Sequence, residues 1–370
     1  MPETKELRIG ISISLTGKFS RQGHQALNAV RLWAAGTDEQ QGVEVGGGER
    51  RRVRILYYDD ESRAPKTREN IARLVQKKRV HVLLGPYSSG LTLAAAEIAG
   101  EYGRMMWSHG GTSDAIYQRG FSHVIGVGSP ASEYFRGLPL WLEKNRPEVR
   151  KIVVAHSPLG TFAAKVTRGI TEAAVALGHH SVDLLTLASH KPADLVRELE
   201  ARQPQAVVLA STFEEEIRML ESRLLWPDSV QCVAAVAAGV QAFHEQLGTA
   251  AENTLGPSQW EPGVAFPEAI GPGSDWFLQA FEQRFGGVPD YPAAAAFAAG
   301  LLIAECIRRA GSLEQGRVRD AAARLDGDTL FGRFRIDPLT GRQTGHQMLL
   351  VEWSGGRKIV LAGDHPSRVW

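Results

Sequence analysis

Residues 80–102, VHVLLGPYSSGLTLAAAEIAGEY, contain in one stretch the unit from which the fold is built. The run VHVLL (80–84) is short, apolar and rich in β-branched residues, which predicts a buried strand. Gly85-Pro86 ends this strand, and Ser88-Ser89-Gly90 begins an alanine-rich helix that runs to about Tyr102. A strand, a tight loop and a helix in this order are typical of a parallel α/β sheet.

The same strand and helix pattern recurs along the chain in two series. The first series has strands at 8–14, 52–58, 80–84 and 104–107, and the second has strands at 151–155, 181–187, 206–210 and 230–235. Helices are expected in the second series at 162–177, 192–202 and 213–225. Two series of similar length predict an α/β protein with two doubly wound parallel sheets, each covered by helices on both faces.

The end of the chain does not fit two lobes that simply follow one another. A strand expected at 253–259 is followed by helices at 273–285, 292–311 and 317–325, and then by a strand-like tail from 332 to 360. This order is natural if the chain crosses back to the first lobe and then returns. Glycine and proline at 126–130, 256–257 and 332 mark three crossings. We therefore expect one lobe of residues 1–126 plus 257–331 and another of 127–256 plus 332–370.

Composition excludes several classes of protein. The 370 residues include 42 lysines and arginines against 41 aspartates and glutamates, and this balance argues against a nucleic-acid-binding surface. The longest apolar run, 293–304, has 12 residues, whereas about 20 span a bilayer, so no insertion into a membrane is expected. Cys232 and Cys306 stand apart from any Cys/His cluster and indicate two buried thiols. His179-His180 indicates a solvated turn rather than a metal site.

Ligands of open α/β sheets bind beyond the carboxyl ends of the strands, which directs attention to the loop 85–90. Small residues there let an anion approach the backbone N–H groups at the start of the helix, and the Ser89 hydroxyl and amide could bind a carboxylate. Thr112, after the next strand, could add a second hydroxyl. Helix capping by Ser89 and Thr112 is the competing interpretation. No P-loop, nucleophile-elbow or complete dinucleotide motif is present, so neither a cofactor nor an enzyme activity is expected.

Five segments carry a resemblance to a known family and run almost from end to end: IGISISLTG (9–17), YDDES (58–62), LLGPYSSGLTLAAAEIA (83–99), SHGGTSDAIYQRGF (108–121) and FGRFRIDPLTGRQTGHQMLLVEW (331–353). In this order and spacing the chain resembles the type I periplasmic binding proteins of ABC importers, in particular the branched-chain amino-acid (leucine/isoleucine/valine-binding) family. The resemblance implies two Rossmann-like lobes joined by three hinge crossings that close on a small ligand. It also implies a periplasmic location and ABC transporter membrane subunits as partners.

The resemblance assigns a carboxylate site to three residues. In this family a serine after the third strand, and a carbonyl and a threonine hydroxyl after the fourth, bind the α-carboxylate of the ligand. The matching positions here are Ser89, Gly110 and Thr112, the same loops that the argument from the sheet selects.

The second lobe departs from the family. Where amino-acid binders carry an acidic residue for the ligand's ammonium, the alignment places Val236, and two amine-holding tyrosines align near Thr161 or Phe162 and near Thr212 or Phe213. Burying an unpaired ammonium is costly. The sequence therefore predicts a carboxylate ligand without an α-amine and with an apolar or aromatic body, although Glu214 could still pair with an amine. Aromatic pocket walls are expected from Tyr87, Trp107, Phe162, Phe213 and Trp260.

Two alternatives stay open. The N-terminal residues MPETKELRIG lack the basic start and apolar core of a secretory signal, so either a signal was removed or the protein is cytoplasmic. A cytoplasmic ligand sensor on the same fold, similar to amide-responsive regulators, is therefore the alternative to an importer component. A serine enzyme that uses Ser89 with His109 is a third and weaker interpretation.

Overall fold

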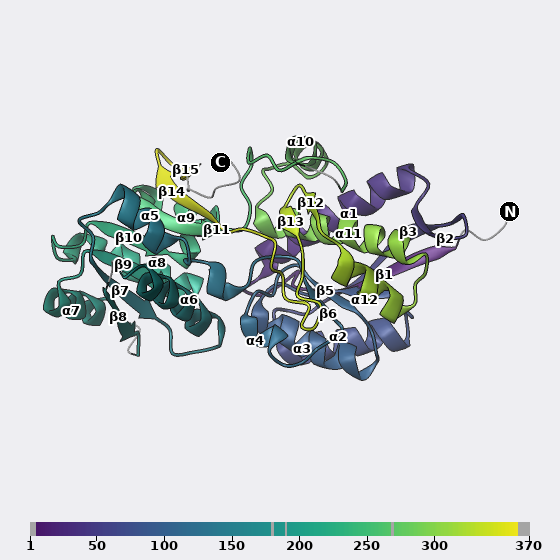
Figure 1. Cartoon of the computed structure of the whole chain (residues 1–370), viewed down its shortest axis with the longest axis horizontal. Coiled ribbons are helices and arrows are strands. Elements are labelled where there is room, and N and C mark those ends of the chain that lie inside the picture. Colours follow the sequence, from purple (N-terminus) through teal and green to yellow (C-terminus); the bar gives the residue numbers. More distant parts are fainter. Residues whose placement is uncertain (1–4, 179–180, 189–190, 268–269, 362–370) are drawn as a thin grey trace. The chain divides into compact units, whose positions relative to one another are not determined.

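The computed structural model describes residues 5–178, 181–188, 191–267 and 270–361, and the chain divides into two compact units (Figure 1). Unit 1 comprises residues 1–129 with 262–347, and unit 2 comprises residues 130–261 with 348–370. His179 and His180 lie outside the described residues.

Unit 1 is built on a six-stranded sheet in the order β2-β3-β1-β4-β5-β6. All neighbouring strands are parallel except β2 and β3, which form an antiparallel edge. Its elements are β1 (Glu6–Ile13), α1 (Ser20–Glu39), β2 (Val43–Gly46), β3 (Glu49–Asp59), α2 (Ala64–Gln76), β4 (Val82–Leu84), α3 (Ser89–Glu101), β5 (Met106–Ser108), α4 (Asp114–Tyr117), β6 (Val124–Gly126), α10 (Ser274–Phe285), α11 (Tyr291–Ala310), α12 (Gln315–Arg324), β12 (Gly327–Thr329) and β13 (Gly332–Phe334).

Unit 2 is built on a seven-stranded sheet in the order β15-β14-β11-β10-β9-β7-β8. The five strands from β11 to β8 are parallel, and β14 and β15 extend the sheet in antiparallel pairs. Its elements are η1 (Ala131–Glu133), α5 (Leu138–Asn145), β7 (Lys151–His156), α6 (Phe162–Leu177), β8 (Ser181–Thr186), α7 (Pro192–Arg202), β9 (Ala206–Ala210), α8 (Phe213–Glu221), η2 (Arg223–Leu225), β10 (Cys232–Ala235), η3 (Val236–Gly239), α9 (Ala242–Leu247), η4 (Gly248–Ala251), β11 (Thr254–Ser258), β14 (Leu349–Ser354) and β15 (Arg357–Val360), where η marks a 3-10 helix.

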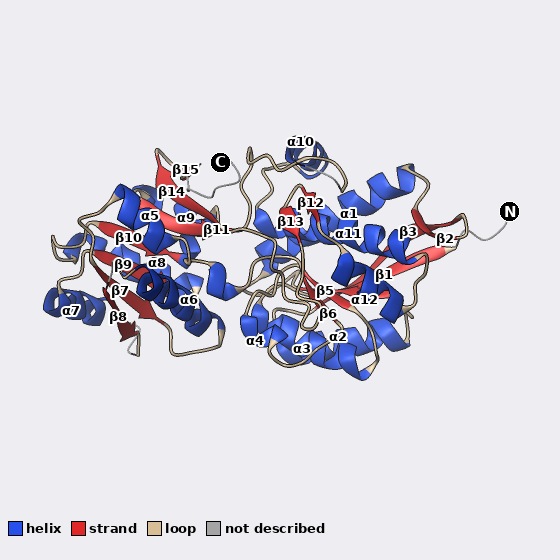
Figure 2. Ribbon diagram, viewed as in Figure 1, coloured by secondary structure: helices blue, strands red, loops and turns tan. Residues whose placement is uncertain are grey.

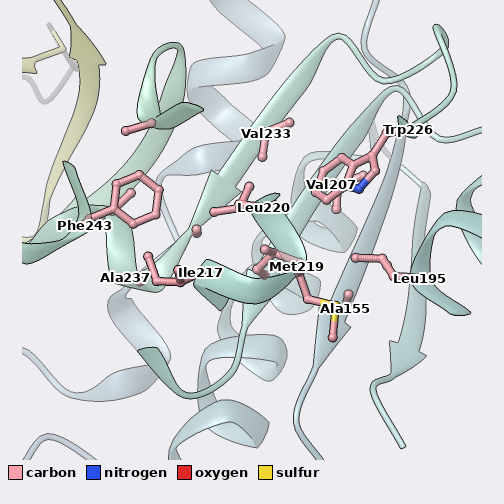
Figure 3. Packing of buried hydrophobic residues seen from close by; sticks show 14 of the residues in the cluster. Ala155, Leu195, Val207, Ile217, Met219, Leu220, Trp226, Val233, Ala237 and Phe243 are labelled. Atoms are coloured by element: carbon pink, nitrogen blue, oxygen red, sulfur yellow. The ribbon is translucent and has the colours of Figure 1, made fainter. Parts of the chain in front are cut away.

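The central strands of unit 2 are buried on both faces, as continuous apolar runs predict. In β9, Val207 and Leu209 belong to one core cluster, whereas Ala206, Val208 and Ala210 belong to the cluster on the other face. Figure 3 shows Ile217, Met219 and Leu220 of α8 packed in the first of these clusters. Helices flank both sheets in Figure 2, which agrees with the expected doubly wound architecture.

In each unit the first strand of the parallel series lies between the second and the third, so the strand order reverses there. In unit 1, β1 lies between β3 and β4, and in unit 2, β7 lies between β8 and β9. At these switch points the two loops that leave the carboxyl ends diverge and leave room for a ligand. The loops after β1 and β4, and those after β7 and β9, are therefore where a site is expected.

The unit boundaries differ from those expected from the sequence. The chain changes unit at 129/130, 261/262 and 347/348, whereas 126/127, 256/257 and 331/332 were expected. The third differs by 16 residues because the segment after β13 is held by unit 1. The amide of Gly126 donates to Gly341 O at 2.9 Å, and Gln343 Nε2 donates to Val127 O at 3.0 Å.

The structure also describes the two cysteines and the helices that bear on the composition. Cys232 and Cys306 are both free and buried, as expected. Within the described ranges, no helix has the length and apolar character needed to cross a membrane, and no group of three or more His, Cys, Asp or Glu residues could hold a metal ion.

Candidate functional site

Ser89 connects the loops that follow β4 and β5 in unit 1. Its Oγ accepts hydrogen bonds from the amides of Thr112 at 3.3 Å and Ser113 at 2.9 Å. Helix capping belongs to neighbouring serines instead: Ser88 Oγ accepts from Leu91 N at the start of α3, and Ser113 Oγ accepts from Ala115 N at the start of α4. Because two amides occupy the lone pairs of Ser89 Oγ, its hydrogen is left to donate to a further acceptor.

Two glycines allow the loop after β5 to lie directly against the loop after β4. Gly110 forms a parallel bridge with Tyr87, and a Cβ added at Gly110 would lie 2.7 Å from Tyr87 Cα. A Cβ added at Gly111 would lie 2.3 Å from Thr92 Oγ1. Larger residues at either position would separate the loops, so these glycines bring Ser89 within reach of the Thr112 amide.

Tyr87 contacts two aromatic side chains from other segments of unit 1. Its hydroxyl is 2.7 Å from that of Tyr291, the first residue of α11, and its ring meets Phe19 edge-on with 5.7 Å between the centroids. Phe19 precedes α1 and so belongs to the loop after β1. Unit 1 therefore brings four of the predicted residues together at one sheet edge: Tyr87, Ser89, Gly110 and Thr112.

His109 lies beside this cluster and is 3 % exposed. Burial lowers its pKa to about 4, so the ring is neutral at physiological pH. Neither ring nitrogen has a hydrogen-bond partner among the described residues. Ser89 Oγ is bonded to the amides of Thr112 and Ser113 rather than to this ring, which does not support a serine nucleophile activated by His109.

In unit 2 the predicted residues follow β7, β9 and β10. Thr161 and Phe162 begin α6, and the Phe162 ring meets Tyr134 edge-on at 5.1 Å. Thr212 caps α8 by accepting from Glu215 N at 3.3 Å, Phe213 follows it against the core, and Val236 begins η3. All five predicted positions are exposed or only partly buried, so their side chains retain surface at the carboxyl edge of the sheet.

Trp260 and Trp107 do not retain such surface. Both indoles are completely buried, and Trp107 packs 5.8 Å from the Phe334 ring. Neither indole adds exposed surface at this edge, and their role as pocket walls stays a prediction.

Glu216 is the residue of this region that sequence reasoning missed. It is completely buried, and its two oxygens accept separate amides, Ser211 N and Ala237 N, each at 2.7 Å. Burial raises its pKa to about 8, although these hydrogen bonds act in the opposite direction. A signal was present: Phe213, Glu216, Ile217 and Leu220 share one helical face, so Glu216 stands in an apolar stripe.

A hollow of about 270 Å³ lies at the opposite edge of the same sheet, where β10 and β11 begin. It is lined in part by Arg223, whose guanidinium donates to Glu252 O at 2.9 Å and Thr254 Oγ1 at 3.0 Å. This hollow is distinct from the candidate site, because it stands at the amino ends of the strands.

The chain is similar to known proteins over most of its length. Residues 6–358 match a family model described as periplasmic binding protein. Among solved structures, the leucine-binding protein LivK of Thermotoga maritima MSB8 has a TM-score of 0.81 at 18 % identity, with 96 % of this chain and 98 % of that chain covered.

Two further structures were determined with ligands. LivJ of Streptococcus pneumoniae, in complex with isoleucine, has a TM-score of 0.80 at 16 % identity over 96 % of this chain and 99 % of that chain. A solute-binding protein of an R. palustris ABC transporter, in complex with benzoate, has a TM-score of 0.76 at 20 % identity over 96 % and 95 %. At these identities the solved structures establish the fold, and with the family model they confirm the expected fold class and the resemblance drawn from the sequence.

Proposed function

Because the chain belongs to the periplasmic binding protein family, we propose that it is the extracytoplasmic solute-binding component of an ABC importer. It binds its ligand without making or breaking a covalent bond, and it delivers that ligand to membrane subunits. The family match and the ABC transporter proteins of the same fold support this role.

The proposed ligand carries a carboxylate that is held by unit 1. Ser89 supports this, because its Oγ accepts two amides and its hydroxyl hydrogen remains to donate to an anion. Thr112 and the Gly110 backbone stand on the adjoining loop and complete the proposed carboxylate site. A hydrogen bond to a charged acceptor contributes about 1.5–3 kcal/mol.

The proposed body of the ligand is apolar or aromatic and carries no α-amine. Val236 stands where amino-acid binders are expected to carry an acidic residue, and the neighbouring Glu216 uses both oxygens for backbone amides. Phe162, Phe213, Thr161 and Thr212 are the other unit 2 residues proposed to select the body. The benzoate complex of a protein with the same fold makes an aromatic acid the first compound to test.

The geometry of Ser89 carries this proposal, and titration calorimetry with benzoate tests it. The S89A variant should bind about 10- to 100-fold more weakly than the wild type, which corresponds to the loss of one charge-assisted hydrogen bond. S312A is the matched control, because Ser312 Oγ also accepts a backbone amide in unit 1 but lies outside the site. Unchanged affinity in S89A, with benzoate or another aromatic acid that binds the wild type, would refute the carboxylate site.

A further inference from the structure

The short helix η3 is held at each end by a buried, titratable side chain. Its four residues, Val236 to Gly239, are neutral and small, and they follow β10 at the edge where unit 2 is proposed to meet the ligand body. At the start of η3, the buried Glu216 carboxyl accepts Ala237 N at 2.7 Å and, through its other oxygen, Ser211 N at 2.7 Å. Glu216 thereby connects the loop after β9 to the loop after β10.

The other end of η3 is bound by a cation. Lys358 Nζ, on β15, donates to Gly239 O at 3.1 Å and lies 2.6 Å from Glu261 Oε1. The side chains of Lys358 and Glu261 are only 7 % and 5 % exposed. Glu261 is the last residue of unit 2 before the chain passes into unit 1 at Pro262, so Lys358 connects η3 to a crossing segment.

The middle of η3 is fixed as well. Trp353 Nε1 donates to Ala238 O at 2.8 Å. Gly239 lies so close to β11 that an added Cβ would be 2.0 Å from Pro257 O. In Figure 3, Ala237 stands beside Ile217 of α8 and near Phe243, which packs in the same core cluster.

Titratable groups are an expensive way to immobilise four small residues: burial disfavours the ionised form of Glu216, and Lys358 is buried as an ion pair with Glu261. Each ion buried in a protein costs several kcal/mol in desolvation, and neutral contacts such as the Trp353 bond are available in the same segment. Groups that meet a ligand, by contrast, gain from being held in the bound geometry before the ligand arrives.

We propose that Glu216 and Lys358 are positioning residues for ligand binding, which hold η3 in one conformation and join it to the loop after β9 and to the crossing at Glu261. This inference rests on the proposed function, since it assumes that η3 faces the ligand. Neither side chain touches the ligand; each acts through the backbone of η3.

The test compares E216Q and K358M with the matched control E252Q. Glu252 also accepts two backbone amides, Gly355 N at 2.7 Å and Gly356 N at 2.8 Å, but at the turn between β14 and β15. Hydrogen exchange of the ligand-free protein reports on η3, and calorimetry with benzoate reports on affinity. If K358M folds poorly, K358M/E261Q removes both charges and still lacks the donor to Gly239 O.

We expect at least tenfold faster exchange of the Ala237 amide in E216Q and at least tenfold weaker benzoate binding in both variants, while E252Q changes neither. Unchanged exchange, or faster exchange with unchanged affinity, would overturn the positioning role. A similar loss of affinity in E252Q would show a general loss of stability in unit 2 and would also overturn it. Failure of the wild type to bind any carboxylate would overturn the proposed function, and the positioning role with it, before a variant is measured.

Discussion

The contact between Gly300 and Trp33 gives the sharpest prediction for the stability of unit 1. It lies where α11 packs against α1, and the N-terminal ends of these two helices place Tyr291 and Phe19 beside Tyr87. A Cβ added at Gly300 would lie 2.3 Å from Trp33 Cδ2 and 2.6 Å from Cγ. Carbon atoms in contact are about 3.5–4.0 Å apart, so the indole would have to move by more than about 1 Å. Trp33 is only 2 % exposed, and a close-packed interior leaves no space for that movement.

The expected size of the effect follows from two opposing terms. Replacing glycine by alanine inside a helix stabilises it by about 1 kcal/mol. Overpacking costs about 1–3 kcal/mol, and an overlap of this depth belongs at the upper end of that range. We therefore expect G300A to lower the free energy of unfolding by about 2 kcal/mol.

Gly36 provides the matched control on α1 itself. A Cβ added there meets nothing within 4 Å, so only the helix propensity changes. G36A should raise the free energy of unfolding by up to about 1 kcal/mol, which gives a difference of about 3 kcal/mol between the two variants. Equilibrium urea unfolding measures both. Equal stabilisation of unit 1 by the two substitutions would refute the packing of α1 on α11.

Two further predictions concern the buried titratable groups of unit 2. Burial raises the pKa of Glu216 from its ordinary value of 4.5 to about 8, so the folded protein holds this proton more tightly than the unfolded chain does. The stabilising contribution of the protonated Glu216 is complete below about pH 4.5 and is lost as the pH rises through about 8. Between these limits, Tm should therefore fall less in E216Q than in the wild type. Parallel profiles of Tm against pH in the two proteins would contradict this prediction. K358M should lower the free energy of unfolding by about 3–5 kcal/mol, because it leaves Glu261 buried without its cation, and E261Q should restore much of the loss in the double variant. Strictly additive effects in that double-mutant cycle would argue against a coupled pair.

The sequence patterns predicted elements best where a segment's burial is decided by its own composition. The strand expected at 206–210 and the helices expected at 162–177 and 192–202 coincide with β9, α6 and α7. The edge strand β2 was not predicted. It is a four-residue segment that pairs antiparallel with β3 around a glycine turn, so its structure depends on a partner more than on its own residues.

The candidate site also contains residues that the sequence predicted and one that it did not. Ser89 and Thr112 were identified because a strand-ending loop with small residues has a fixed place at the sheet edge, and the family resemblance selected the same loops. Glu216 lies in the first turn of α8, where the helix dipole favours an acidic residue, so its position alone indicates no other role. Its actual role depends on the amide of Ala237, 21 residues further along the chain, and no local pattern specifies that approach.

Glu216, which accepts the amide of Ala237 in η3, also bears on whether the ligand carries an α-amine. A ligand ammonium near Val236 would need an ionised carboxylate, yet Glu216 is completely buried and burial favours its neutral form. Leucine and 4-methylpentanoate differ only in the α-amine, so a comparison of their affinities isolates the effect of that amine. We expect 4-methylpentanoate to bind at least tenfold more tightly, because leucine would have to bury an ammonium without a counter-charge. If leucine binds more tightly, the E214Q variant identifies the partner: Glu214 is exposed in the first turn of α8, and loss of the preference in that variant would place the amine there.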